Sequence, residues 1–372
     1  MASIYVPNYL TDQESIAFNE EFESSDQYRA AFMNAAPDEI AYGASTTQLF
    51  RNLAMSLLPN LNTDSEIIVS ILCHEASIGA WTFLAARLGI AIKWWTPGRT
   101  NNPTLDLEKL KSLMSPKTRL VTCGHVSNLM GTIHPIKEVA DIVHATPGAM
   151  LCVDGVAYAP HRRIDVKALD VDFYCFSWYK VFGPRLGMMY ARRSVQDRSM
   201  ASLGHYYLDH RPLGTKLCLG WTAAFDVRSG LTAIMRYLDR IGWDAITKHE
   251  EKLTEALLSY LRSKPDIYVI YGEQSSDPDL RVSLITFSVK GWTPEDIANE
   301  IMNHSTIRIG WSHAYSKRLV EEVLGLDGEQ GVVRVSFVHY NSLEEVNLLI
   351  KLLDHIICER LGKTRKPRTV KL

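Results

Sequence analysis

The sequence predicts an α/β protein whose large domain is built on a mainly parallel β-sheet and is followed by a smaller α+β domain. Two observations predict this architecture. Between residues 40 and 192, short apolar runs alternate with segments of helical periodicity, the pattern typical of parallel strands covered by helices on both faces. The 372 residues also exceed the length of an ordinary single domain, so two packed domains are expected.

The elements of the large domain alternate between strand and helix. The expected strands are Glu66–Leu72, Ala91–Trp95, Thr118–Cys123, Ala149–Asp154 and Phe173–Ser177. The expected helices are Gln48–Leu57, Ala76–Leu88, Leu105–Met114 and Pro135–His144, the last with proline in its first turn. Ligands of such sheets bind beyond the carboxyl ends of the strands, so polar residues at those ends are candidates for a site.

The C-terminal part changes from one long helical pattern to a mixture of short segments. Residues 223–264 have helical periodicity, and a final helix is expected at Ser342–Arg360. The apolar segments between them are Ile267–Tyr271, Arg281–Val289, Thr306–Ile309 and Val332–Val338. We therefore expect an N-terminal arm over residues 1–35, a large domain over 36–240 and a small α+β domain over 241–372.

Composition and charge exclude several classes of protein. Forty basic residues against 42 acidic ones give a net charge of −2, which offers no basis for binding nucleic acid or a membrane surface. We expect no signal peptide, and no apolar run is long enough to cross a bilayer. The six cysteines include no Cys-x-x-Cys pair, so we expect neither disulfides nor a metal site. A cytoplasmic protein fits this composition best.

A carboxylate and an amine are expected to meet at the ends of neighbouring strands. Asp154 ends one strand, and Lys180 lies just beyond the next. A partly desolvated lysine loses its proton more readily, and the free amine is a nucleophile toward an aldehyde. A carboxylate suits the ring nitrogen of pyridoxal 5′-phosphate (PLP), which must stay protonated for the ring to accept electrons. Taken singly, such an aspartate is more often a turn or cap residue, and such a lysine is more often solvated surface.

The phosphate of this cofactor needs hydroxyl and backbone N–H groups, ideally at the start of a helix. The stretch Gly43-Ala-Ser-Thr-Thr47 offers them just before an expected helix, through Ser45, Thr46 and Thr47. A plain helix N-cap is the alternative interpretation of these hydroxyls. In combination with the strand-end carboxylate and amine, they predict a PLP site.

Two stretches around these residues, Val153–His161 and Asp172–Pro184, resemble the class V aminotransferases of PLP fold type I, the cysteine-desulfurase-like group. The resemblance covers residues 31 to 355, nearly the whole chain. It implies PLP fold type I with a seven-stranded large-domain sheet. It also implies that Lys180 holds PLP covalently and that Asp154 pairs with the pyridine nitrogen.

The same resemblance implies further roles around the cofactor and the substrate. They are ring stacking for His74, contact with the cofactor O3′ and the substrate for Asn128, phosphate-side positions for Thr46, Ser177 and Tyr179, and a grip on the substrate α-carboxylate for Arg334. A guanidinium fork suits that last task because it binds a carboxylate through two parallel hydrogen bonds. The substrate side would also include Arg308 and His313.

Three departures from the family pattern are informative. Cysteine desulfurases carry a nucleophilic cysteine on a mobile loop, whereas the matching stretch Arg308–Tyr315 has none and places His313 near that position. A persulfide mechanism therefore lacks its nucleophile. Many members also have a glutamine three residues after the aspartate, where this chain has Ala157. Most of the N-terminal strand and loop that usually line the substrate entrance are also missing.

Four further strings are similar to a fungal PLP-dependent decarboxylative aldolase of this family, an enzyme of secondary metabolism. They are Cys73–Ala76, Ile92–Pro97, Leu113–Cys123 and Asp170–Lys180. This resemblance implies that the substrates are L-aspartate and an aldehyde and that the product is a γ-hydroxy-α-amino acid. The resemblance to the class V family also implies a homodimer in which the Gly220–Thr222 segment reaches the phosphate of the partner subunit.

Other interpretations stay open at this stage. One is a different PLP-dependent lyase on the same scaffold, either a C–S lyase such as a desulfurase with another nucleophile or a simple aspartate β-decarboxylase. Another is a non-catalytic relative that keeps the fold as an interaction module. The presence of Asp154, Lys180, His74 and Arg334 argues against the second interpretation.

Overall fold

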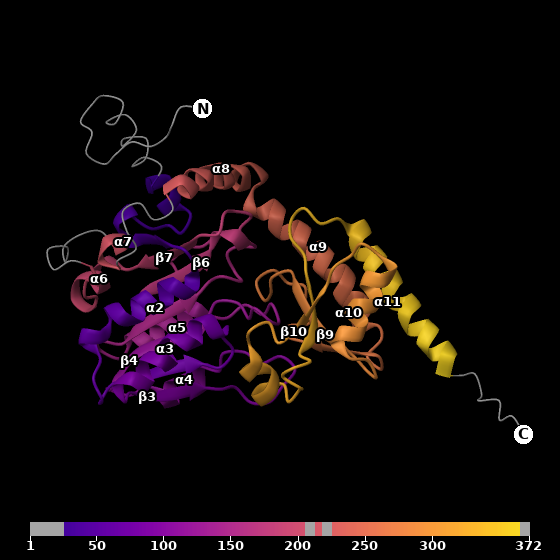
Figure 1. Ribbon diagram of the computed structural model, residues 1–372, viewed down its shortest axis with the longest axis horizontal. Coiled ribbons are helices and arrows are strands. Elements are labelled where there is room, and N and C mark those ends of the chain that lie inside the picture. Colours follow the sequence, from indigo (N-terminus) through magenta and orange to yellow (C-terminus); the bar gives the residue numbers. More distant parts are fainter. Residues whose placement is uncertain (1–25, 205–212, 218–224, 365–372) are drawn as a thin grey trace, which may run out of the picture.

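The computed structural model describes residues 26–204, 213–217 and 225–364, and it contains two β-sheets, each packed with its own helices (Figure 1). The larger unit holds a seven-stranded sheet and the smaller one a four-stranded sheet. This arrangement confirms the predicted α/β fold class. The expected N-terminal arm lies largely outside the described residues, as does the Gly220–Thr222 segment.

The large sheet is parallel except for one strand. Its strands are β1 (Ile40–Gly43), β2 (Glu66–Ser70), β3 (Ala91–Trp95), β4 (Thr118–Gly124), β5 (Met150–Asp154), β6 (Phe173–Ser177) and β7 (Gly187–Ala191). They lie in the order β1-β7-β6-β5-β4-β2-β3, and β7 runs antiparallel to both of its neighbours. The five expected strands are all present, and the bounds of β3 and β6 match the prediction. β1 and β7 were not among the expected strands. β1 follows a short 3-10 turn, and β7 follows β6 without an α-helix between them, so neither continues the alternation of strand and helix that marks the others.

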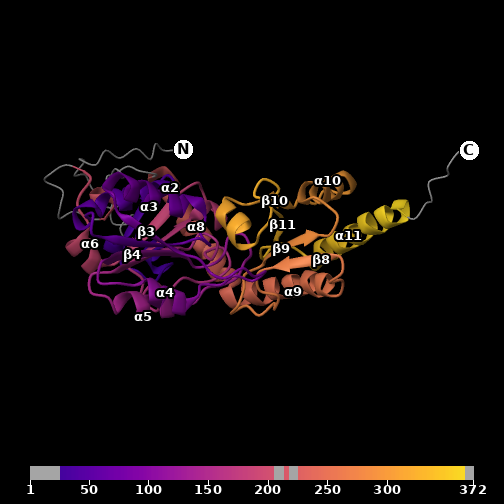
Figure 2. The ribbon, with the colours of Figure 1, turned by 90° about the horizontal axis from the view of Figure 1, so that it is seen from below.

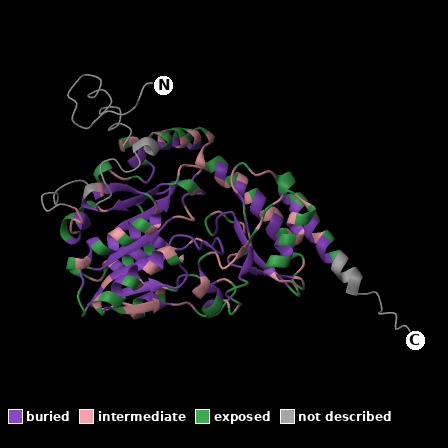
Figure 3. Ribbon diagram, in the orientation of Figure 1, coloured by how far each residue is buried: buried purple, intermediate pink, exposed green. Residues whose placement is uncertain are grey.

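Helices cover both faces of this sheet, as Figure 2 shows with α2 and α3 above it and α4 and α5 below it. The helices of the large unit are α2 (Thr46–Ser56), α3 (Glu75–Leu88), α4 (Leu107–Leu113), α5 (Ile136–His144), α6 (Arg193–Ser199), α7 (Leu213–Lys216) and α8 (Phe225–Ile241). Successive strand residues point to opposite faces, so Ile67 and Val69 join the core under α2 and α3, whereas Ile68 joins the core under α4 and α5. Apart from the edge strand β3, the strands of this sheet are buried on both sides (Figure 3), which explains their continuous apolar runs.

The smaller unit packs three helices on an antiparallel sheet with the order β10-β11-β9-β8. Its elements are α9 (Trp243–Arg262), β8 (Tyr268–Tyr271), β9 (Leu284–Val289), α10 (Pro294–His304), β10 (Gly310–Ser312), β11 (Val332–Ser336) and α11 (Leu343–Thr364). The long helical pattern of the sequence is divided into α8 and α9 at Gly242. The φ of Gly242 is 85°, which lies outside the right-handed helical region. The apolar segment Thr306–Ile309 lies just before β10 rather than in a strand.

Two loops join the units and bring them to one edge of the large sheet. The loop after β4 pairs with the start of the small sheet through a bridge between Thr132 and Arg281 and a hydrogen bond from Thr286 Oγ1 to the Leu129 carbonyl. The loop after β10 crosses back to the start of α3, where the Tyr315 carbonyl accepts a hydrogen bond from the Glu75 N–H group. Across the described residues, none of the helices is both long and apolar enough to cross a membrane.

Candidate active site

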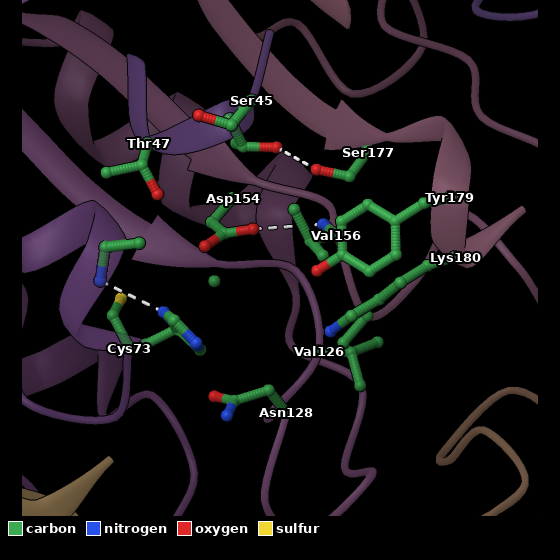
Figure 4. A pocket seen from close by; sticks show the side chains of 15 residues that line it. Ser45, Thr47, Cys73, Val126, Asn128, Asp154, Val156, Ser177, Tyr179 and Lys180 are labelled. Carbon is green, nitrogen blue, oxygen red and sulfur yellow. Dashed lines mark hydrogen bonds between the residues drawn. The ribbon is translucent and has the colours of Figure 1, made fainter. Parts of the chain in front are cut away.

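A pocket opens at the carboxyl ends of the parallel strands, where the fold class predicts a site (Figure 4). Its walls come from the ends of β4, β5 and β6 and from the starts of α2 and α3. The residues that line it are Ser45, Thr46, Thr47, Cys73, His74, Ala76, Gly124, Val126, Asn128, Asp154, Val156, Ala157, Ser177, Tyr179 and Lys180. Nine of the twelve residues predicted to form the site therefore lie in one cavity.

Asp154 and Lys180 both point into this pocket (Figure 4). Asp154 is the last residue of β5 and is buried, and its Oδ1 accepts a hydrogen bond from the Val156 N–H group at 3.0 Å. Burial raises the pKa of this carboxyl, while the Val156 N–H group and the charge of Lys180 oppose the rise. Burial likewise lowers the pKa of Lys180, which Asp154 opposes and Arg334 reinforces. A lysine with a lowered pKa supplies the free amine that covalent binding of an aldehyde requires.

His74 forms the wall at the start of α3. It is the N-cap residue of that helix, and its Nδ1 accepts a hydrogen bond from the Ala76 N–H group at 3.0 Å. The neutral ring therefore carries its proton on Nε2. Burial, aided by the charges of Lys180 and Arg334, lowers its pKa to about 4. A ring that is neutral at pH 7 can lie on an electron-poor heterocycle without charge repulsion.

Hydroxyl groups gather at the opposite end of the pocket. Ser45 caps α2 by accepting a hydrogen bond from Gln48 N–H, and Thr46 Oγ1 bonds Ser177 Oγ across the pocket floor. The start of α2 can approach β7 this closely because Gly187 has no side chain; a Cβ there would lie 2.8 Å from Thr46 N. Hydroxyls at a helix start form a cradle for a phosphate group.

Asn128 and Arg334 meet at the boundary between the two units. Arg334 Nη1 donates to the Asn128 carbonyl at 2.9 Å, and burial lowers the pKa of the guanidinium. In the described part of the chain, no carboxylate pairs with Arg334, which leaves donors for a substrate carboxylate. The Asn128 amide is already engaged: Nδ2 donates to the Ala314 carbonyl at 2.8 Å, and Oδ1 accepts from Ser316 Oγ at 3.0 Å.

The structure does not bring every predicted residue to the pocket. Arg334 lies beside it without lining it, and its charge acts on both His74 and Lys180. Arg308 is exposed, and its Nη1 bonds the carbonyls of its own loop. His313 accepts a hydrogen bond from the Tyr315 N–H group and does not line the cavity. The substrate-binding roles of Arg308 and His313 therefore stay predictions.

Sequence reasoning missed several residues around the pocket. Val126 and Val156 form apolar parts of the wall, and Cys73 is buried in it. Tyr315 and Ser316 reach the site from the small unit. The valines follow predicted strand ends and could have been found there. The two loop residues had no such signal, since their position depends on contacts between distant parts of the chain.

The lining residues fit PLP on three observations. A buried carboxylate lies where a protonated ring nitrogen would need an anion, and its Oδ2 has no hydrogen-bond partner among the described residues. An amine with a lowered pKa lies in the same pocket, and hydroxyls line its far end. Within the described ranges, by contrast, no group of three or more His, Cys, Asp or Glu side chains is placed to hold a metal ion.

The lowered pKa values of three histidines predict that the fold loses stability in mild acid. Burial is the main cause that lowers the pKa of His74 to about 4, of His125 to about 3 and of His134 to about 4, from an ordinary 6.5. Between pH 6.5 and 4 the unfolded chain binds protons that the folded chain does not. As the pH is lowered through this window, the free energy of unfolding should therefore fall by roughly 1.4 kcal/mol per pH unit for each histidine.

The urea midpoint measured between pH 7.5 and 5 checks this expectation. His134 Nδ1 bonds the Gly124 carbonyl, and its buried Nε2 has no hydrogen-bond partner among the described residues. His134→Gln therefore removes one titrating group with little change in shape. The variant should lose less stability than the wild type over this window, whatever its stability at pH 7.5. An identical pH dependence for the two proteins would contradict the expectation.

The family model described as Aminotransferase class-V matches residues 11–349. The nonribosomal peptide synthetase-like enzyme fsqF of Aspergillus fumigatus is 54% identical over 329 residues, which cover 88% of this chain and only 22% of that protein. The cysteine desulfurase-like protein ustD of Aspergillus flavus is 52% identical over 333 residues, which cover 88% of this chain and 76% of that protein. The solved apo structure of a cysteine desulfurase from Thermococcus onnurineus matches with a TM-score of 0.84 at 26% identity, over 95% of this chain and 87% of that chain.

Proposed function

The chain belongs to the class V aminotransferase family and is a PLP-dependent enzyme, and we propose that it removes the β-carboxylate of L-aspartate and joins the resulting carbon to an aldehyde. The products are carbon dioxide and a γ-hydroxy-α-amino acid. The fungal relatives at 54% and 52% identity support a place in fungal secondary metabolism. The observation that carries the proposal is a pocket that holds Asp154 and Lys180 and, among the described residues, no thiol other than the buried Cys73.

Each residue of the pocket has a proposed task. Bound PLP supplies an aldehyde for amines and a ring that draws electrons from the neighbouring carbon. Asp154 keeps the ring nitrogen protonated, and His74 covers the ring. The amine of Lys180 takes the proton from the substrate α-carbon as general base. Arg334 grips the α-carboxylate, because its guanidinium is anchored through one nitrogen and keeps its other donors.

The pocket also suits loss of the second carboxylate of aspartate. Of the described residues that line it, Lys180 is the single cation, and Val126, Val156 and Ala157 make part of the wall apolar. A carboxylate without a cationic partner in a poorly hydrated place is favoured to leave as carbon dioxide, because its charge disperses on leaving. The carbon left behind can then bond to the carbonyl carbon of the aldehyde.

The cysteines argue against a desulfurase reaction. Cys73 is the cysteine that lines the pocket, and burial raises its pKa well above the ordinary value. Cys123, Cys152 and Cys175 are also buried and have raised pKa values for the same reason. A thiol attacks as its thiolate, so none of these four is suited to accept sulfur at neutral pH.

The experiment that tests the proposal supplies L-aspartate to the PLP-loaded protein with and without benzaldehyde. Carbon dioxide release and new amino acids are followed by mass spectrometry. We expect a product whose mass is the sum of the substrates less carbon dioxide, formed when both substrates are present. Alanine as the sole product would make the protein a simple aspartate β-decarboxylase. Release of sulfide from L-cysteine at a higher rate than carbon dioxide from L-aspartate would support a C–S lyase instead.

We further propose that a second copy of the chain covers the groove between α2 and α3, which begins beside the pocket. The groove has a volume of about 880 Å³ and shares Thr47 and Ala76 with the pocket wall. Phe83 is 61% exposed there with Arg87 stacked over its ring, and Met55 is exposed beside it. Exposed apolar groups gathered in one groove are typical of an interface. A homodimer across this groove would complete the phosphate end of each pocket.

A charge at the centre of this groove should separate the two copies. The variant Phe83→Asp buries a carboxylate at the proposed interface, so the mass measured by light scattering at micromolar concentration should fall from dimer to monomer. Leu348→Asp is the control, since it adds the same charge at an exposed apolar position on α11 of the other unit. A monomeric wild type, or a Phe83→Asp variant that stays dimeric, would contradict the proposal.

A further inference from the structure

The loop over residues 312–318 is fastened beside the pocket, to Glu75 at the start of α3 and to Asn128 after β4. The Tyr315 carbonyl accepts from the Glu75 N–H group at 2.8 Å, and the Asn128 amide is held between Ala314 and Ser316. A further ion pair joins Arg318 to Glu75 at 3.4 Å. In the cysteine-desulfurase pattern the matching stretch is a mobile loop with a nucleophile. Here it is tied to the large unit by backbone and side-chain bonds on both sides of Tyr315.

The backbone of this loop is held in a conformation that its residues rarely adopt. Ala314 and Tyr315 have φ values of 46° and 59°, in the left-handed region that disfavours residues with a side chain. The loop also needs Gly331, because a Cβ at that position would lie 2.0 Å from the Ser312 carbonyl carbon. Consecutive strained residues persist only where the surroundings determine them, and they occur most often at functional sites. The loop therefore presents the Tyr315 side chain in one fixed place.

That side chain stands beside the pocket with two other rings. Its centroid is 5.0 Å from that of the His74 ring, at an interplanar angle of 32°. Tyr179 lines the pocket and is 52% exposed. Its pKa is raised mainly by burial and by the charge of Asp154, and Tyr315 raises it further. Tyr315 itself is 68% exposed, so its ring has a free face.

We propose that Tyr315 is a specificity-determining residue that selects aldehydes with a planar aromatic group, by binding that group against its exposed ring beside the pocket. The proposal rests on the proposed function, because it concerns the second substrate of that reaction. Tyrosine supplies a rigid aromatic surface at little cost in conformational entropy, and here the loop has already fixed its position. Contact between two aromatic rings contributes binding free energy beyond that of burying apolar area. An open-chain aldehyde can bury apolar area but cannot make this ring contact.

Two variants at position 315 distinguish the contribution of the aromatic ring from that of the loop conformation. Tyr315→Asn removes the ring but tolerates the positive φ, and Tyr315→Phe keeps the ring without the hydroxyl. With saturating L-aspartate, kcat/KM is measured for benzaldehyde and for butanal. We expect Tyr315→Asn to lose roughly tenfold for benzaldehyde, mainly through a higher KM, and less than about twofold for butanal. Tyr315→Phe should stay close to the wild type for both, and all three proteins should keep the visible absorbance of bound PLP.

Binding without reaction gives a second readout. Saturation-transfer NMR with benzyl alcohol, which cannot react as an aldehyde, should show contact with the PLP-loaded wild type and with Tyr315→Phe but a much weaker signal with Tyr315→Asn. If the wild type makes no product from any aldehyde, the proposed function fails while this binding measurement still decides the role of Tyr315. Equal binding by all three proteins, or equal losses for benzaldehyde and butanal, would overturn the inference.

Discussion

Replacing Lys180 with alanine is expected to abolish both the visible absorption band of lysine-bound PLP and the turnover of L-aspartate. Lys180 is the lysine that lines the pocket, and burial lowers its pKa so that the free amine is available. The variant loses the covalent link to PLP and the general base together. General acid–base catalysis alone contributes about 10²–10⁴-fold, so we expect turnover to fall by at least a factor of about 10³.

The control is Lys109→Ala, which removes an exposed lysine on α4, away from the pocket. It should keep both the absorption band and the turnover of the wild type. Urea unfolding of each variant shows whether the fold is kept, so a loss of structure is not mistaken for a loss of chemistry. A Lys180→Ala protein that still turns over L-aspartate at more than about a thousandth of the wild-type rate would refute the role proposed for this residue.

The change Asp154→Asn is expected to leave PLP bound but to slow the reaction by roughly 10²–10³-fold, the range seen when one electrostatic group of an active site is removed. Asparagine has nearly the same shape and can still accept the hydrogen bond from the Val156 N–H group. It lacks the negative charge that keeps the ring nitrogen protonated. The measurement is kcat at saturating L-aspartate, with Asp244→Asn at an exposed position of α9 as the control.

For Asp154→Asn we also expect a change in the pH dependence of PLP uptake. The charge of Asp154 raises the pKa of Lys180, so its removal should lower that pKa further and free the amine at lower pH. The rate at which the PLP-free protein takes up added PLP should therefore reach its half-maximum at lower pH in Asp154→Asn than in the wild type. A midpoint that does not move, or that moves upward, would show that the two groups are not coupled as proposed.

The central part of the site was predictable because strand ends can be found in a sequence. Buried parallel strands are continuous apolar runs, so the amino-acid pattern alone placed the ends of β5 and β6 at Asp154 and Ser177. Parallel strands end at the same edge of a sheet, which brings their following residues together. The helix break at Gly242 could not be placed in this way, because the helical pattern continues through it.

The sequence by itself determined the fold class, the strand ends and the carboxylate and amine that meet there, because these depend on local periodicity and on a general rule of parallel sheets. Only the tertiary structure decided how the small unit closes the site. Ser316 bonds Asn128 across 188 positions of the chain, and Tyr315 reaches His74 from the other sheet. Such contacts arise from packing two units against each other, and no local pattern records which residues that packing will bring together.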